Sequence, residues 1–139
     1  MSQPFEILEH TADIGLRAFG GSSAELFENA AAALLAISYQ HDSVAERETR
    51  EIAATGDDRE SLLVNWLQEL VWLIDGEGWL PHHVTVREIT ATAVKGIASG
   101  EPRDGARHDF HVIVKAITYH QLAIREKNGQ WTAEVYLDI

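Results

Sequence analysis

The sequence predicts an α+β fold in which a mixed sheet of about six strands carries two helices packed on one face. Three observations predict it. Apolar and polar residues alternate near both ends of the chain, two internal stretches place apolar residues at helical spacing, and no repeat or linker divides the chain. The 139 residues are a usual length for one domain with a continuous core. We therefore expect a single domain over residues 1–139.

The first two strands are expected on either side of a short polar segment. Residues 5–8 suit a short strand, and residues 14–19 place three aliphatic side chains on one face. The segment between them, residues 10–13, reads His-Thr-Ala-Asp. Asp13 therefore stands where a polar loop enters a strand.

Each helix is expected to begin at a capping box, in which a side chain of the first turn accepts a backbone hydrogen bond. Ser22 with Glu25 starts the first helix, which ends near Ile37, and Asp57 with Glu60 starts the second. Apolar positions recur at intervals of three and four, so one face of each helix should pack. These positions are Leu26, Phe27, Ala30, Ala31, Leu34 and Leu35 in the first helix and Leu63, Trp66, Leu67, Leu70, Val71 and Ile74 in the second.

The remaining strands are expected between and after the helices. Residues 44–54 carry many charges and are predicted to form an exposed edge strand. Asn128-Gly129 indicates a hairpin turn. Alternating and β-branched residues predict further strands at 84–89, 90–98 and 131–137, a loop at 100–105, and an extended stretch from 108 to 125.

The composition excludes several classes of function. The chain has no cysteine, which rules out disulfides, thiolate zinc sites, iron–sulfur clusters and cysteine nucleophiles. Its 22 acidic and 11 basic residues give a formal charge of -11, so we expect no strong direct nucleic-acid binding and favour cations or a basic protein partner. There is no signal-peptide pattern and no apolar run near the roughly 20 residues of a membrane span, so we expect a soluble cytoplasmic protein without a membrane association. The common nucleotide-binding, hydrolase and protease motifs are absent.

Two aspartates and the end of the chain form the first candidate site. Asp13, Asp138 and the terminal carboxylate of Ile139 would supply hard oxygen donors for a calcium, magnesium or manganese ion. The last residues alternate between apolar and polar side chains, so this carboxylate would lie on an amphipathic strand that holds it in place. The alternative is that Asp13 is an ordinary turn residue and that the terminus frays.

Lys115 and His120 form the second candidate site, facing a partner or a nucleotide. In a regular strand their side chains point to opposite faces, so a bulge or bend must separate them if they act together. The alternative is a core strand whose lysine extends to the surface.

The remaining histidines are interpreted as surface residues. His82 and His83 are adjacent, and His108 and His111 are three apart, so on strands each pair would point to opposite faces. Such pairs do not make a convincing zinc site.

Taken together, three segments resemble the signature segments of the archease family. They are residues 10–20 with the sequence HTADIGLRAFG, residues 114–120 with the sequence VKAITYH, and the final Leu-Asp-Ile of residues 137–139. The resemblance extends over essentially the whole chain. Two positions depart from the family pattern: Ile113 stands where a polar or acidic residue is expected, and Gln121 stands where a glycine is frequent.

The resemblance implies an activator of RtcB-type RNA ligases, which use GTP to join RNA ends that carry a 2′,3′-cyclic phosphate or a 3′-phosphate in tRNA splicing and RNA repair. Archeases are understood to promote guanylylation and turnover of the ligase without joining RNA, so this chain is not expected to be an enzyme. The family's divalent metal site corresponds to Asp13, Asp138 and Ile139. Its lysine corresponds to Lys115, and His120 closes the same segment.

Two other classes of function stay open. One is a small metal-dependent hydrolase in which His120 acts as the general base. The other is a chaperone-like adaptor that offers Trp66, Trp72 or Trp79 to several clients. The first predicts turnover by the isolated protein, and the second predicts broad binding that does not depend on Asp13.

Overall fold

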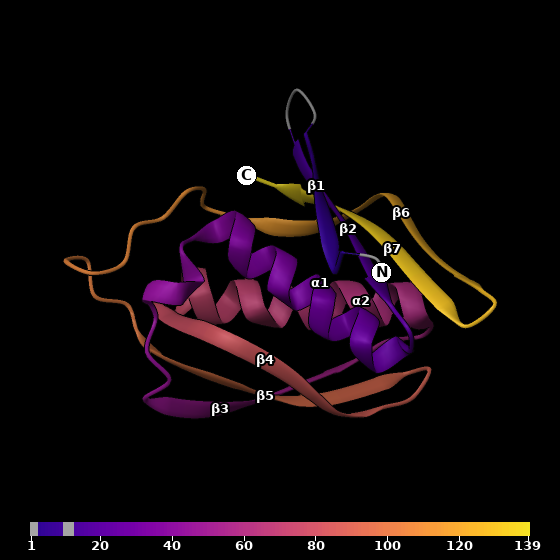
Figure 1. The fold of residues 1–139 in the computed structure, drawn as a ribbon, viewed down its shortest axis with the longest axis horizontal. Helices are drawn as coiled ribbons and strands as arrows, with labels where there is room; N and C mark the ends of the chain where they lie inside the picture. Colours follow the sequence, from indigo (N-terminus) through magenta and orange to yellow (C-terminus); the bar gives the residue numbers. More distant parts are fainter. Residues whose placement is uncertain (1–2, 10–12) are drawn as a thin grey trace.

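The computed structural model describes residues 3–9 and 13–139 and arranges them in three layers, with two helices between two β-sheets (Figure 1). The strands of both sheets are antiparallel. The four-stranded sheet has the order β1-β2-β7-β6 and contains β1 (Phe5–Glu9), β2 (Asp13–Gly20), β6 (Ala116–Lys127) and β7 (Gln130–Asp138). The three-stranded sheet has the order β3-β5-β4 and contains β3 (Glu48–Thr55), β4 (Trp79–Ile89) and β5 (Ala93–Pro102).

The helices α1 (Ser23–Ser38) and α2 (Arg59–Val71) form the middle layer. Helix α1 contacts β2 of one sheet and β4 of the other, and α2 contacts β6 and β3 in the same manner. The predicted α+β class is confirmed. The arrangement of strands differs from the prediction, because they form two antiparallel sheets rather than one mixed sheet with both helices on a single face.

The width of the buried surface on α1 explains the second sheet. Its buried residues form two adjoining rows along the helix, and at 100° per residue these rows together cover about 200° of the circumference. A single sheet cannot bury so wide a surface, so the helix packs between two. The rows consist of Leu26, Ala30, Ala33 and Ile37, and of Phe27, Ala31, Leu34, Leu35 and Ser38.

Both helices begin at side-chain caps. Ser22 Oγ accepts a hydrogen bond from Glu25 N at 3.1 Å, and the Glu25 carboxylate accepts a second one from the backbone just before the helix, as predicted. Helix α2 begins one residue later than predicted, with Asp58 as its cap in place of Asp57. Asp58 Oδ1 accepts from Ser61 N at 2.8 Å, and Ser61 Oγ accepts from Asp58 N at 3.1 Å. Asp58 rather than Asp57 caps the helix because Ser61, three residues later, returns the hydrogen bond.

Two short helical turns complete the helical structure, a 3₁₀ turn at His41–Ser43 and a π turn at Trp72–Gly76 that continues α2. Of the helices in the described part of the chain, none is long and apolar enough to cross a membrane.

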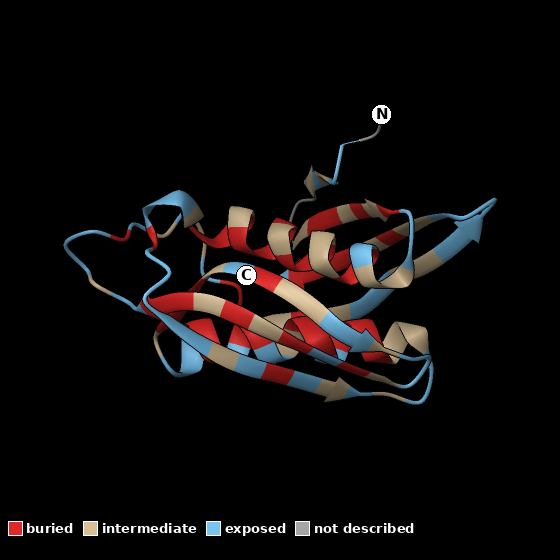
Figure 2. Cartoon of the chain, turned by 60° about the horizontal axis from the view of Figure 1, so that its bottom comes forward, coloured by how far each residue is buried: buried red, intermediate tan, exposed pale blue. Residues whose placement is uncertain are grey.

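The core lies where the buried sides of the helices and sheets meet (Figure 2). Trp66 and Trp79 are 0% and 2% exposed, and their indole nitrogens donate to Phe27 O at 3.1 Å and to Glu48 Oε1 at 2.7 Å. Trp72, by contrast, is 56% exposed. An adaptor surface could draw on Trp72 but not on the other two tryptophans proposed for it.

Several predicted strands and turns are confirmed, with changed bounds. β3, the expected exposed edge strand, begins at Glu48 rather than at residue 44. β5 runs from Ala93 to Pro102, into the loop predicted for residues 100–105. Asn128 and Gly129, with φ of 54° and 78°, form the turn between β6 and β7. The extended stretch predicted from residue 108 becomes a regular strand only at Ala116, and residues 103–115 form a loop before it.

Candidate functional site

Asp13 and Asp138 lie directly opposite each other on neighbouring strands. β2 and β7 pair in an antiparallel register in which the Cα of Asp13 is the partner of the Cα of Asp138. Side chains of directly opposed residues share one face of the sheet, with Cβ atoms about 4.5–5.5 Å apart. The structure therefore brings together two carboxylates that stand near opposite ends of the sequence.

This carboxylate pair is on the face of the sheet that points away from the helices. The next pair along the strands, Ile14 and Leu137, belongs to the opposite face, where Leu137 is fully buried. Asp13 is partly exposed and Asp138 is exposed. Among residues 3–9 and 13–139, neither carboxylate has a hydrogen bond or an ion pair. Two adjacent carboxylates that form no ion pair repel each other, and a bound cation would reduce that repulsion.

Backbone connections place Lys115 and Ile139 next to the carboxylate pair. Lys115 N donates a hydrogen bond of 2.8 Å to Asp138 O, and Ala116 of β6 pairs with Asp138. Ile139 follows directly and is 37% exposed. The exposed side chain of Lys115 forms no ion pair with any residue in the described part of the chain. Four of the five predicted site residues thus meet at one end of the four-stranded sheet.

The fifth, His120, lies on the same face, within a bulge of β6. Thr118 pairs with Tyr136 but the next registered pair is Ala123 with Glu134, so residues 119–122 all lie opposite one residue of β7. The His120 ring packs edge-on against the Tyr136 ring, with 6.2 Å between their centroids. Tyr136 shares its face with Asp138, because the two are two residues apart on a strand. The register shift falls between Thr118 and Ala123, so His120 lies inside the irregular segment, and joint action of Lys115 and His120 stays a prediction.

Gln121 has a backbone conformation that explains why a glycine would suit this position. Its φ of 53° lies in the left-handed region, which side chains disfavour and glycine adopts readily. Gln121, which replaces the glycine frequent in the family, therefore keeps the bulge but has a strained backbone conformation.

Tyr136 and Gly15 are parts of this face that the sequence analysis did not single out. They are cross-strand partners, and a Cβ atom on Gly15 would lie 2.7 Å from Cε2 of Tyr136. The glycine therefore leaves room for the tyrosine ring beside the carboxylate pair. A glycine inside a strand is a signal for such close packing and could have indicated it.

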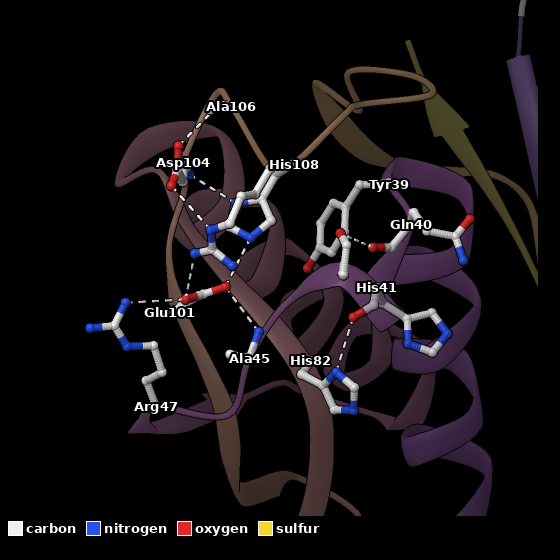
Figure 3. A network of polar contacts seen from close by, with 12 residues as sticks. Tyr39, Gln40, His41, Ala45, Arg47, His82, Glu101, Asp104, Ala106 and His108 are labelled. Atoms are coloured by element: carbon white, nitrogen blue, oxygen red, sulfur yellow. Dashed lines mark hydrogen bonds and ion pairs between the residues drawn. The ribbon is translucent and has the colours of Figure 1, made fainter.

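The loop that leads to Lys115 is held by a buried carboxylate (Figure 3). Glu101, at the end of β5, has no exposed side-chain surface. Its Oε2 accepts hydrogen bonds from His108 Nε2 and from Ala45 N, both at 2.9 Å, and its Oε1 accepts from Arg107 Nη2 at 2.9 Å. Asp104 N donates to Nδ1 of His108 at 2.8 Å, so Nδ1 carries no proton and Nε2 is the protonated nitrogen.

These contacts determine the charge of Glu101. The hydrogen bond from Arg107, followed by those from Ala45 N and His108, lowers the pKa of Glu101 from 4.5 to about 2, although burial acts in the opposite direction. The prediction that His108 is a surface residue was wrong. It is 2% exposed, because Glu101 and the Asp104 backbone satisfy both of its ring nitrogens.

A second group of histidines lines a hollow of about 120 Å³ between α1 and β4. The pairing of β4 shifts register between Pro81 and His83, so His82 and His83 both line this hollow, together with His41. His82 Nδ1 is 3.0 Å from His41 O, and the two rings are 5.8 Å apart (Figure 3). Within the described ranges, no three His, Cys, Asp or Glu side chains are grouped so that they could hold a metal ion.

Comparison with known proteins identifies the family. Residues 5–139 match the model of the Archease protein family (MTH1598/TM1083). The chain belongs to the archease family. It is 39% identical to Protein archease of Methanosarcina mazei, over 97% of this chain and 95% of that protein. It is 40% identical to Protein archease of Pyrococcus abyssi, over 97% of this chain and 98% of that protein.

Solved structures of archease-like proteins share the fold. The solution structure of Methanobacterium thermoautotrophicum protein 1598 superposes with a TM-score of 0.82 at 32% identity and covers 98% of this chain and 99% of its own. The Thermotoga maritima protein, described as an archease and possible chaperone, gives a TM-score of 0.69 at 23% identity over 100% of this chain and 98% of its own. The family resemblance seen in the sequence is thereby confirmed.

Proposed function

We propose that this archease-family protein is an accessory protein that activates an RtcB-type RNA ligase in tRNA splicing or RNA repair. In this role it promotes guanylylation and repeated turnover of the ligase and does not itself act on RNA. The observation that carries the proposal is the register of β2 and β7, which opposes Asp13 and Asp138 at an exposed end of the sheet beside Lys115.

The proposal includes a divalent cation held by Asp13, Asp138 and the main-chain carboxylate of Ile139. The donor chemistry fits, because the aspartates share one face and have no cationic partner in the described residues. Since the two aspartate side chains alone are too few, the Ile139 carboxylate is needed to complete the set. All-oxygen ligation favours calcium, magnesium or manganese over zinc. A bound cation would present positive charge to an anionic group of the partner or its nucleotide.

The surroundings of the carboxylate pair support a protein partner. Ile113, Tyr119 and Ile139 are 42%, 59% and 37% exposed, and all three are close in sequence to Lys115 or Asp138. Exposed apolar side chains next to polar groups are typical of protein–protein contact surfaces. The net charge of -11 suits a partner whose RNA-binding cleft is basic.

The test is a guanylylation assay in which GTP and RNA ends are in excess over a purified RtcB-type ligase. We expect the wild-type protein to increase ligase guanylylation and the number of turnovers, and Asp13→Asn and Asp138→Asn to lose this effect while remaining folded. Asp57→Asn, an exposed aspartate outside the site, is the matched control. No stimulation by the wild-type protein would overturn the proposal. RNA cleavage by the isolated protein would instead favour a hydrolase.

A further inference from the structure

Thr118 stands at the point where β6 leaves its regular pairing with β7. Thr118 pairs with Tyr136, whereas the next registered pair is Ala123 with Glu134. The ladder between two strands fixes the face to which each side chain points, and the four residues between the two registered pairs have lost this constraint. Another contact must therefore determine where the side chain of His120 lies.

The hydroxyl of Thr118 makes two hydrogen bonds at this point. Its Oγ1 donates to Tyr136 O at 3.0 Å and accepts from His120 N at 3.2 Å. The second bond joins a side chain to the backbone two residues later, and threonine uses this pattern to form a local turn in place of regular strand pairing. One hydroxyl thus connects β7 to the backbone of the residue that carries the imidazole.

The imidazole of His120 is held beside the carboxylate pair. Its ring packs against that of Tyr136 with 6.2 Å between the centroids and 68° between the planes. Tyr136 is only 4% exposed although its face of the sheet points away from the helices, so neighbouring side chains cover its ring. Asp138 lies two residues further along β7 and shares this face. The imidazole is therefore one side-chain position away from the two aspartates.

Gln121 is the other feature that shapes the irregular segment. Its φ of 53° turns the chain in a way that an extended residue does not. Because Gln121 follows His120, it determines how the chain returns to β7. Thr118 precedes His120 and determines how the chain leaves β7.

We infer that Thr118 is a positioning residue whose hydroxyl holds His120 against Tyr136, beside the carboxylate pair. Loss of the hydroxyl should release the imidazole while β6 and β7 stay paired on either side of the irregular segment. An effect on ligase activation rests on the proposed function, in which the imidazole would donate to an anionic group of the partner.

The test follows the ring proton signals of His120 by NMR in full-length protein that carries isotope-labelled histidine. Their loss in His120→Gln assigns them, and Tyr136→Leu shows how far the tyrosine ring displaces them. We expect Thr118→Val, which keeps the shape of the side chain without its hydroxyl, to move the signals most of the way to their Tyr136→Leu positions. Thr118→Ser, which keeps the hydroxyl, should leave them near their wild-type positions.

Thr132→Val is the matched control. Thr132 lies on the same outward face and is partly exposed like Thr118, but its hydroxyl has no hydrogen bond among the described residues. Unchanged His120 signals in Thr118→Val, or equal changes in both valine variants, would overturn the inference.

Amide hydrogen exchange gives a second measurement that needs no variant. In the wild-type protein the His120 amide donates to Thr118 Oγ1, so it should exchange at least about tenfold more slowly than in an unstructured peptide. An unprotected His120 amide would also overturn the inference, even if Thr118→Val failed to fold.

The guanylylation assay tests the consequence for the partner. Thr118→Val should lower the number of ligase turnovers by about 3- to 10-fold, whereas Thr118→Ser and Thr132→Val should stay within about 2-fold of the wild type. Full activation by a Thr118→Val protein with displaced His120 signals would overturn the role of Thr118 in activation. If the wild-type protein does not stimulate the ligase, the proposed function fails, and the His120 signals still decide whether Thr118 positions the imidazole.

Discussion

The carboxylate of Glu101 and the imidazole of His108 form a 2.9 Å hydrogen bond in which neither side chain has any exposed surface. The two residues lie at opposite ends of the turn that begins the loop 103–115, and the same carboxylate also accepts from Ala45 N. One buried charge therefore ties this loop to the segment that precedes β3. The loop delivers Lys115 to Asp138, so these contacts support the candidate site from a distance.

We predict that Glu101→Gln lowers stability in a pH-dependent way. The pKa of Glu101 in the folded protein, about 2, lies below its ordinary value of 4.5. A lowered folded-state pKa stabilises the protein above the unfolded-state pKa, and this contribution is lost as the pH falls through the folded-state value. The free energy of unfolding should thus be lower in the variant at pH 7, with a difference that shrinks between about pH 5 and 2. Urea unfolding across this range measures it, with the exposed Glu126→Gln as control. A difference that stays constant would contradict the prediction.

We predict that Gly15→Ala disturbs the face that carries the carboxylate pair. The new Cβ atom would lie 2.7 Å from the Tyr136 ring, which must move away. The free energy of unfolding should fall by about 1–2 kcal/mol because the added methyl group overpacks this position. The loss should stay this small because the strands remain paired. Ligase activation should fall as well. Gly105→Ala, where nothing lies within 4 Å of the new atom, is the control in thermal and chemical unfolding. Equal stabilities of the two variants would show that Tyr136 needs no such space.

We predict that Gln121→Gly preserves or increases stability, whereas Gln121→Val decreases it. With a φ of 53°, a β-branched side chain is strained and glycine is not. We expect a loss of about 1–2 kcal/mol for valine and a change of less than about 1 kcal/mol for glycine. Chemical unfolding measures both, and Gln130→Gly, at the start of β7, shows what glycine costs in a strand. If Gln121→Gly lost as much unfolding free energy as Gln121→Val, the backbone at Gln121 would not be strained.

We predict that Lys115→Ala reduces ligase activation more than stability. Its side chain is exposed and forms no ion pair with the described residues, so its loss should leave the free energy of unfolding within about 0.5 kcal/mol. Guanylylation assays and unfolding curves should be compared with those of Lys127→Ala, an exposed lysine at the far end of β6. Full activation by a folded Lys115→Ala protein would assign the lysine to surface solubility alone.

We predict that one extra residue after Ile139 weakens divalent cation binding and ligase activation together. The extension moves the main-chain carboxylate and leaves every side chain unchanged. Calorimetric titration with calcium, magnesium and manganese should show weaker binding for the extended chain and unchanged binding for Ile139→Val, which keeps the carboxylate in place. Unaltered affinity in the extended chain would leave the metal proposal without its third donor.

Features that depend on neighbouring residues could be predicted from the sequence. The start of α1 at Ser22, the turn at Asn128-Gly129 and the exposed edge strand β3 follow from capping, turn chemistry and local charge. Strand alternation separates the side chains of Lys115 and His120, but it could not locate the register shift, which falls between Thr118 and Ala123. The family signature added the expectation that Asp13 and Asp138 act together.

Tertiary structure decided the features that depend on distant partners. Local periodicity could not show that α1 packs between two sheets. In the sequence its two apolar rows adjoin and read as a single apolar face. It could not show that His108 is buried, since the charge that holds it, Glu101, belongs to another strand. The opposition of Asp13 and Asp138 likewise comes from the pairing of the second strand with the last. Residues far apart in sequence meet only when the whole chain has folded, and that is why no local pattern determines which of them become partners.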